Sequence, residues 1–330
     1  MMTIAGIVGT DADALARLHR ASSRRPAPTE AVDPATPVDR TRPFLCESLT
    51  PLAYAPSYPR LTPPQRLRYN QLTAMHFNEM MVLLETTFDG LLRRLAEEEI
   101  PGFPPGLAAC AGDFLREETE HAGMFRRLNR LSEPAWYADR DFYILRVPRA
   151  AQWILARVLR RPEWFSFALW ILLSQEEHTL ELSRRCARLP ADAIEPHYRA
   201  VYAAHAADEA RHVRVDVHFL DRFHRPASRW RRAANAAVFR LLVRRFFLVP
   251  SRGALRVVDL LTREFPELRP WRRRLAGELK DLPRDPAYQR VLYSRESTPL
   301  TFAGFDAYPE FQSIRGILTA YRPRAAEAAG

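Results

Sequence analysis

The stretches Glu117-Glu118-Thr119-Glu120-His121 and Asp208-Glu209-Ala210-Arg211-His212 both contain the pattern Glu-x-x-His. Each lies inside a long segment whose apolar residues recur with the spacing of an amphipathic α-helix. Because side chains three residues apart share one face of a helix, each motif can direct a carboxylate and an imidazole toward the same point. We therefore expect two helices of this chain to present paired ligands for a metal ion.

Two such helices, together with one Glu from each of two further helices, form the di-iron or di-manganese site of ferritin-like bundles. The periodicity of the chain predicts four long helices, at about 64–99, 105–131, 162–188 and 191–224. No alternating strand pattern persists over any length. The sequence thus predicts an all-α fold, a ferritin-like four-helix bundle with additional C-terminal helices.

The flanking regions differ in composition from the predicted bundle, which we place at about residues 61–225. Residues 1–60 are rich in Pro, which indicates an extended, partly disordered N-terminal arm with one short helix near Asp11–Ser22. Residues 226–330 are expected to pack on the bundle as accessory helices, at about 227–247, 250–264 and 267–281, followed by an irregular tail. The expected packing anchors of that tail are Phe302, Phe305, Tyr308 and Phe311.

The first predicted helix offers two candidate carboxylates for the metal site. Glu85 flanks the apolar stripe that contains Met81 and Phe88, whereas Glu79 aligns with Asp89 on a more polar face. A ligand of a buried site must lie toward the core, so we predict Glu85 as the ligand. Glu79 remains the alternative, and its expected role otherwise is that of a solvated charge.

The third predicted helix poses the same choice between neighbouring residues. Glu176 shares a face with Leu173 and Leu180, whereas Glu177 aligns with Glu181 and other charged residues that are expected to be solvated. Periodicity therefore favours Glu176 as the ligand, with Glu177 as the alternative.

The fourth predicted helix carries a third histidine on the stripe of its motif. His205 lies one helical turn before Glu209, and His212 follows on the same face. Asp208 is rotated off that line, and we expect it to accept a hydrogen bond from a ligating imidazole of the second or fourth helix. A surface ion pair of Asp208 with Arg211 or Arg214 is the alternative. The complete predicted ligand set is Glu85, Glu118, His121, Glu176, His205, Glu209 and His212.

Polar side chains on an otherwise apolar stripe must be paired or bind a metal, because burying them bare is costly. A metal-free Glu–His hydrogen-bond network is the simpler alternative, but it has to explain several carboxylates and imidazoles at one level of the bundle. Mixed oxygen and nitrogen ligands suit iron or manganese. We predict two iron ions as the cofactor, with manganese also compatible, and these ions would share the reduction of O₂.

The predicted ligand set, with His205 one turn before the second Glu-x-x-His, resembles that of the p-aminobenzoate N-oxygenase family. This resemblance covers roughly residues 60–225 and implies a ferritin-like di-iron enzyme of specialised metabolism. Such enzymes oxidise amino groups, typically of aryl amines, through the hydroxylamine toward a nitro product. The resemblance also implies that His205 is an additional iron ligand.

Two other functions fit parts of the pattern. Glu117-Glu118-x-x-His121 and Asp208-Glu209-x-Arg211-His212 are similar to the paired motifs of acyl-carrier-protein desaturases, and Gln175-Glu176 is similar to their third-helix ligand. His205 argues against a desaturase, since that family has no third histidine at this place. A metal-storage bundle is the alternative of another class, although it would not need the additional C-terminal helices.

Composition limits the partners that we expect. The 330-residue chain has a formal net charge of +10, but its arginines are spread over many helices, so we expect no nucleic-acid partner. The apolar stretch from Trp164 to Leu173 is too short to cross a membrane. Three widely spaced cysteines without a C-x-x-C pattern suit the cytoplasm and offer no iron–sulfur ligands. We therefore expect a cytoplasmic homodimer that takes electrons from a separate ferredoxin or reductase and acts on a small amine with O₂.

Overall fold

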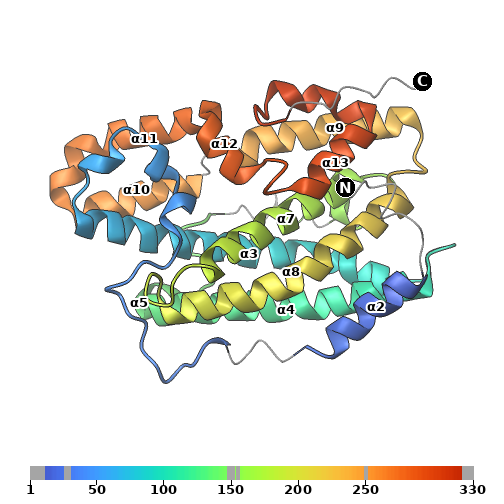
Figure 1. The fold of residues 1–330 in the computed structure, drawn as a ribbon, viewed down its shortest axis with the longest axis horizontal. Helices are drawn as coiled ribbons and strands as arrows, with labels where there is room; N and C mark the ends of the chain where they lie inside the picture. The colour runs from blue at the N-terminus through green and yellow to red at the C-terminus, as the bar shows by residue number, and fades with distance from the viewer. Residues whose placement is uncertain (1–11, 26–30, 147–152, 154–156, 249–251, 322–330) are drawn as a thin grey trace.

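The computed structural model describes residues 12–25, 31–146, 153, 157–248 and 252–321, and none of these lies in a strand. Four long helices lie side by side across the centre of the molecule (Figure 1). They are α3 (Pro63–Glu97), α4 (Pro105–Ser132), α7 (Phe167–Ala187) and α8 (Pro196–Phe223). α3 packs mainly on α4 and α7 mainly on α8, and α4 joins the two pairs through its contact with α8. The predicted all-α ferritin-like bundle is confirmed.

Local sequence signals set where these helices begin. Pro63, Pro105 and Pro196 each occupy the first helical turn, where a missing N–H is tolerated. Thr62 and Gln65 form a capping box at the start of α3, and the Glu195 carboxylate accepts the backbone N–H of Tyr198 at the start of α8. The predicted starts of the third and fourth helices are each five residues too early, because turns follow Pro162 and Pro190 instead of helices.

The accessory region forms helices along one side of the bundle, where α10 packs on α3 and both α9 and α13 pack on α7 (Figure 1). The described part of this region contains the following helices: α9 (Arg229–Leu242), α10 (Arg252–Glu264), α11 (Arg272–Asp281), α12 (Pro286–Leu292) and α13 (Pro299–Ala307). The prediction of an irregular tail is wrong, since α13 and a 3₁₀ helix (Pro309–Gly316) occupy it. α13 is apolar around most of its circumference and so shows no amphipathic period. Phe302, Phe305 and Phe311 are fully buried, as expected of packing anchors.

The described part of the predicted N-terminal arm is packed on the bundle. The expected short helix is present as α2 (Ala12–Ser23), which lies against α4 and α8. Residues 31–60 form three short 3₁₀ turns and bury Phe44 and Leu52. The rest of the predicted arm, residues 1–11 and 26–30, lies outside the described residues. Residues 12–25 of the predicted arm therefore lie beside α4 and α8, the two helices that carry the Glu-x-x-His motifs.

α10 packs on α3 at a point where only a glycine fits. A Cβ atom built on Gly253 would lie 2.0 Å from Nε2 of His76, whose side chain is buried. Burial also lowers the pKa of His76 to about 4, so this ring is neutral at pH 7. By contrast, a Cβ atom on Gly277 in α11 would meet nothing within 4 Å.

The replacement Gly253→Ala should therefore destabilise the fold, although Gly→Ala inside a helix normally stabilises it. We expect Gly253→Ala to lower the free energy of unfolding by about 1–3 kcal/mol, because His76 must move out of a packed position. The matched control, Gly277→Ala, should raise it by about 0.5–1 kcal/mol through helix propensity. Denaturant unfolding measures both, and equal stabilisation by the two substitutions would contradict the close packing of α10 on α3.

Candidate metal centre

The four bundle helices direct seven buried side chains toward one region. Each of the seven has a relative exposure of 2% or less. α3 supplies one, α4 two, α7 one and α8 three, and together they are Glu85, Glu118, His121, Glu176, His205, Glu209 and His212. One ligand atom from each of Glu118, His121, Glu209 and His212 lies within 4.8 Å of the others, and Glu85, His121 and His205 form a second such group. The structure thus brings together all seven residues of the predicted ligand set.

Glu209 lies at the centre of this cluster. Its Oε1 atom is 3.1 Å from Nε2 of His205, 3.4 Å from Nδ1 of His212 and 3.6 Å from Nδ1 of His121. Glu118 Oε1 reaches the His121 and His212 rings at 3.4 and 3.2 Å. Glu209 therefore faces all three imidazoles.

Glu85 and Glu176 complete the cluster on opposite sides. Glu85 approaches His205 at 3.5 Å and His121 at 3.7 Å, whereas Glu176 Oε2 lies 3.6 Å from Nδ1 of His212. These two carboxylates therefore approach the imidazoles from α3 and α7, the two bundle helices that supply none of the three candidate imidazole ligands.

The atoms that face the middle of the cluster lack hydrogen-bond partners in the described part of the chain. They are both carboxylate oxygens of Glu85 and Glu209, Oε1 of Glu118, Oε2 of Glu176, Nδ1 of His121 and His212, and Nε2 of His205. Buried polar atoms without partners are rare because each one costs free energy. These orphaned oxygen and nitrogen atoms are the donors that iron or manganese takes, so the residues present fit a metal centre.

The other nitrogen of each imidazole points outward to a defined partner. His121 Nε2 lies 3.0 Å from Oδ2 of Asp208, and His212 Nε2 lies 2.8 Å from Oε2 of Glu117. His205 Nδ1 lies 3.1 Å from the Ser183 hydroxyl. A hydrogen bond donated outward leaves the inner nitrogen of the neutral ring free to bind a metal, which is the usual arrangement of ligating histidines.

The two acidic partners are exchanged between the motifs. Asp208 precedes Glu209 on α8 but contacts His121 of α4, while Glu117 precedes Glu118 on α4 but contacts His212 of α8. The prediction that Asp208 contacts a candidate imidazole ligand agrees with this arrangement, but the same role of Glu117 was not predicted. The sequence does contain an indication of it, because Glu117 precedes Glu118 just as Asp208 precedes Glu209.

Burial and charge shift the pKa values of these groups in opposite directions. Burial, reinforced by a neighbouring carboxylate, raises the pKa of Glu85 and Glu209 well above the usual range. Burial also acts to raise the pKa of Glu117, but hydrogen bonds from His212 and Ser22, together with the charge of Arg211, hold it at about 2. Glu85 and Glu209 are thus short of positive charge, whereas the outer carboxylate of Glu117 is well compensated.

Glu79 and Glu177 are the alternatives to Glu85 and Glu176, and the sequence predicts that they are solvated. That prediction is wrong, because both side chains are buried. Glu79 accepts hydrogen bonds from the Tyr137 hydroxyl and from the backbone N–H groups of residues 143–145. Glu177 accepts the backbone N–H groups of Leu300 and Thr301, each at 2.7 Å, at the start of α13. Neither residue belongs to the two clusters of candidate ligands. Their carboxylates instead bind the segments that cover α3 and α7.

The helical bundle and its buried Glu–His cluster define an all-α ferritin-like protein with a candidate metal site. The family model described as P-aminobenzoate N-oxygenase AurF matches residues 9–275. The chain therefore belongs to this family, which consists of di-iron oxygenases. The match includes α2 and α10 and so extends beyond the predicted range of 60–225. No curated protein matches the chain. Among the described residues, no helix is both long and apolar enough to cross a membrane.

The contacts of Glu176 and Glu177 lead to opposite expectations for the variants Glu176→Ala and Glu177→Ala. Glu176→Ala should lower the number of bound metal ions, because it removes a carboxylate that faces the cluster. Glu177→Ala should keep the metal but lower the free energy of unfolding by about 1–3 kcal/mol, since two buried N–H groups lose their acceptor. Metal analysis and denaturant unfolding test the pair. Loss of metal in Glu177→Ala with full retention in Glu176→Ala would overturn the assignment.

Proposed function

We propose that this chain is a di-iron oxygenase that uses O₂ to oxidise an amine. The observation that carries the proposal is the convergence of seven buried side chains whose inward atoms lack other partners. The family supports an oxygenase acting on a small molecule. The substrate class that fits best is an aryl amine, which would be converted to the hydroxylamine and onward toward the nitro compound.

Two iron ions would be held by Glu85, Glu118, His121, Glu176, His205, Glu209 and His212. Manganese suits the same donors, but the family supports iron. When bound, the iron ions would supply the electrons that activate O₂. The protein's own tasks are to hold and orient the ligands and to keep the site dry. Phe114, stacked on the His212 ring at 3.8 Å between centroids, and Phe125, with its ring 5.2 Å from that of His205, serve the second task.

The overall reaction needs two electrons besides the amine and O₂. An amine, O₂, two electrons and two protons give a hydroxylamine and water, so one oxygen atom joins the nitrogen and the other leaves as water. The chain has three cysteines without the spacing of an iron–sulfur site, so we propose an external ferredoxin or reductase as the electron donor.

His205 favours amine oxygenation over the two alternatives. Its ring is fully buried, and its inner nitrogen lies 3.1 Å from Glu209. Acyl-carrier-protein desaturases, which have similar paired motifs, lack a histidine at this place. A metal-storage bundle oxidises no organic substrate, so it does not need such an additional ligand.

The proposal is tested by following both oxygen and substrate. Iron-loaded protein is mixed with a reductant, ¹⁸O₂ and a panel of aryl amines that includes p-aminobenzoate. We expect a product heavier by one ¹⁸O atom on nitrogen. Glu85→Ala should abolish the product because it removes a proposed ligand. Glu97→Ala should not, although it removes a carboxylate from the same helix, because the side chain of Glu97 is 60% exposed.

The alternatives have different products. A desaturase would give an acyl product two hydrogens lighter and free of ¹⁸O, whereas a storage bundle would oxidise iron repeatedly and accumulate a mineral. Dehydrogenation of an acyl chain, with every amine unchanged, would refute the proposed N-oxygenation.

A further inference from the structure

We propose that Arg25, two residues after the end of α2, is a positioning residue for the candidate metal centre. The guanidinium of Arg25 holds the two carboxylates that orient His121 and His212, and α2 carries it there. The inference rests on the proposed function only in that these histidines bind metal. Arg25 belongs to the Pro-rich N-terminal region, and no motif around it predicts that it reaches the site.

The contacts of Arg25 connect the outer partners of both motifs. Nη1 of Arg25 lies 2.9 Å from Oδ2 of Asp208, and Nε lies 3.2 Å from Oε1 of Glu117. The Arg25 side chain is only 8% exposed, and it also pairs with Glu120. Because Asp208 and Glu117 in turn bind the outer nitrogens of His121 and His212, one planar guanidinium is a single residue away from two proposed ligands.

Charge balance explains why an arginine is needed here. Glu117 and Asp208 are buried carboxylates, with relative exposures of 1% and 3%. Arg211 contacts both, with 3.1 Å to Glu117, and Arg25 supplies the second positive charge. Arg116 also approaches Glu117, at 3.5 Å, but its side chain is 45% exposed and its field is weakened by water. Without Arg25, one buried carboxylate would lose its compensating cation, and breaking such a pair is strongly destabilising.

α2 is fixed in place by contacts that do not involve Arg25. Leu15 is buried in the main core, and its backbone oxygen lies 3.5 Å from the Cys110 thiol of α4. Ser22, the second-last residue of α2, donates its hydroxyl hydrogen to Glu117. The helix therefore approaches the site independently of the guanidinium, which makes a substitution at Arg25 a specific probe.

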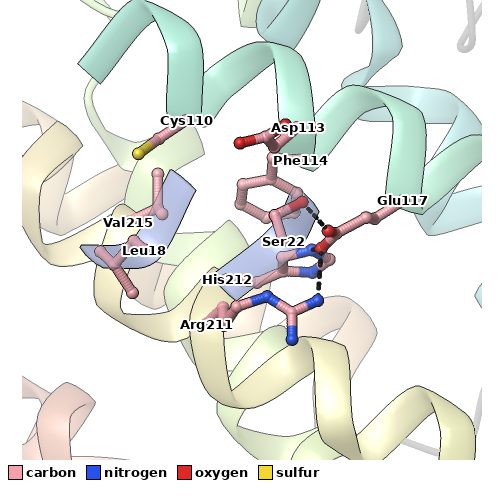
Figure 2. A pocket seen from close by; sticks show the side chains of 9 residues that line it. All are labelled: Leu18, Ser22, Cys110, Asp113, Phe114, Glu117, Arg211, His212 and Val215. Carbon is pink, nitrogen blue, oxygen red and sulfur yellow. Dashed lines mark hydrogen bonds and ion pairs between the residues drawn. The ribbon is translucent and has the colours of Figure 1, made fainter. Parts of the chain in front are cut away.

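α2 also covers the side of the cluster nearest to a small pocket. Figure 2 shows Ser22 and Arg211 reaching Glu117, beside the His212 ring, with Leu18 of α2 on the opposite wall. The free space in the pocket has room for about one water molecule, far less than an aryl amine requires. α2 thus closes this side of the site to substrate, while Arg25 helps to hold the imidazoles in place.

The experiment compares Arg25→Gln and Arg25→Lys with Arg24→Gln. Arg24 is the neighbouring arginine and is exposed, so Arg24→Gln removes the same charge from the same segment. The affinity of the metal-free protein for Co²⁺ is measured against a competing chelator, and the visible spectrum of bound Co²⁺ reports ligand geometry. Arg25→Gln should weaken binding by about 10-fold and alter the spectrum, the lower end of the effects of direct partners of ligating histidines, because Arg25 acts through Glu117 and Asp208. Arg25→Lys should recover part of both, and Arg24→Gln should match the unchanged protein.

A second measurement needs no metal. In metal-free protein labelled with ¹⁵N at histidine, the ring N–H protons that His121 and His212 donate to Asp208 and Glu117 should be protected from exchange. Both should exchange faster in Arg25→Gln, whereas Arg24→Gln should leave them protected. If the unchanged protein bound no metal but Arg25→Gln still lost this protection, the proposed function would fail and the positioning role would stand. Unchanged protection and unchanged Co²⁺ binding in folded Arg25→Gln, or in Arg25→Lys if Arg25→Gln does not fold, would overturn the inference.

Discussion

The structure depends on how negative charge is neutralised in the middle of a helical bundle. Four glutamates from four helices, Glu85, Glu118, Glu176 and Glu209, face one another in a region with almost no access to solvent. Burying carboxylates is strongly unfavourable unless they are paired, protonated or bound to metal. Two divalent cations would neutralise these four charges while the three imidazoles stay neutral. The carboxylates that contact the outer sides of the imidazoles form an outer layer around these inner four, and they also need neutralising charges. Glu117 and Asp208 form ion pairs with Arg25 and Arg211.

These two layers explain the repeated form of the motifs. In each one, the Glu and the His of Glu-x-x-His face inward, while the acidic residue before the Glu is rotated toward the helix of the other motif. A change in the rotation of α4 or α8 would therefore disturb both a ligand of its own helix and the partner of a histidine on the other. This mutual dependence joins the two helix pairs at the level of the site, where α4 contacts α8.

Helical periodicity was sufficient to predict the inner layer but not its surroundings. It placed Glu85 and Glu176 on the inner faces of their helices, and the structure brings both to the cluster. It failed for Glu79 and Glu177, because their burial depends on residues 143–145 and on α13, which come from distant parts of the chain. The role of Arg25 could not be predicted either, because its partners Glu117 and Asp208 lie far from it in the sequence. α13 also lies outside the residues matched by the family, although it binds the neighbour of Glu176.

The central claim is that the buried cluster binds two metal ions, and metal stoichiometry tests it most directly. Metal-free protein is titrated with Fe²⁺ without oxygen, unbound iron is removed, and the iron remaining per chain is measured. Mössbauer spectroscopy after oxidation then reports whether the ions are magnetically coupled. The account predicts close to two ions per chain, coupled as a pair. Retention of no iron, or of a single uncoupled ion, would contradict it.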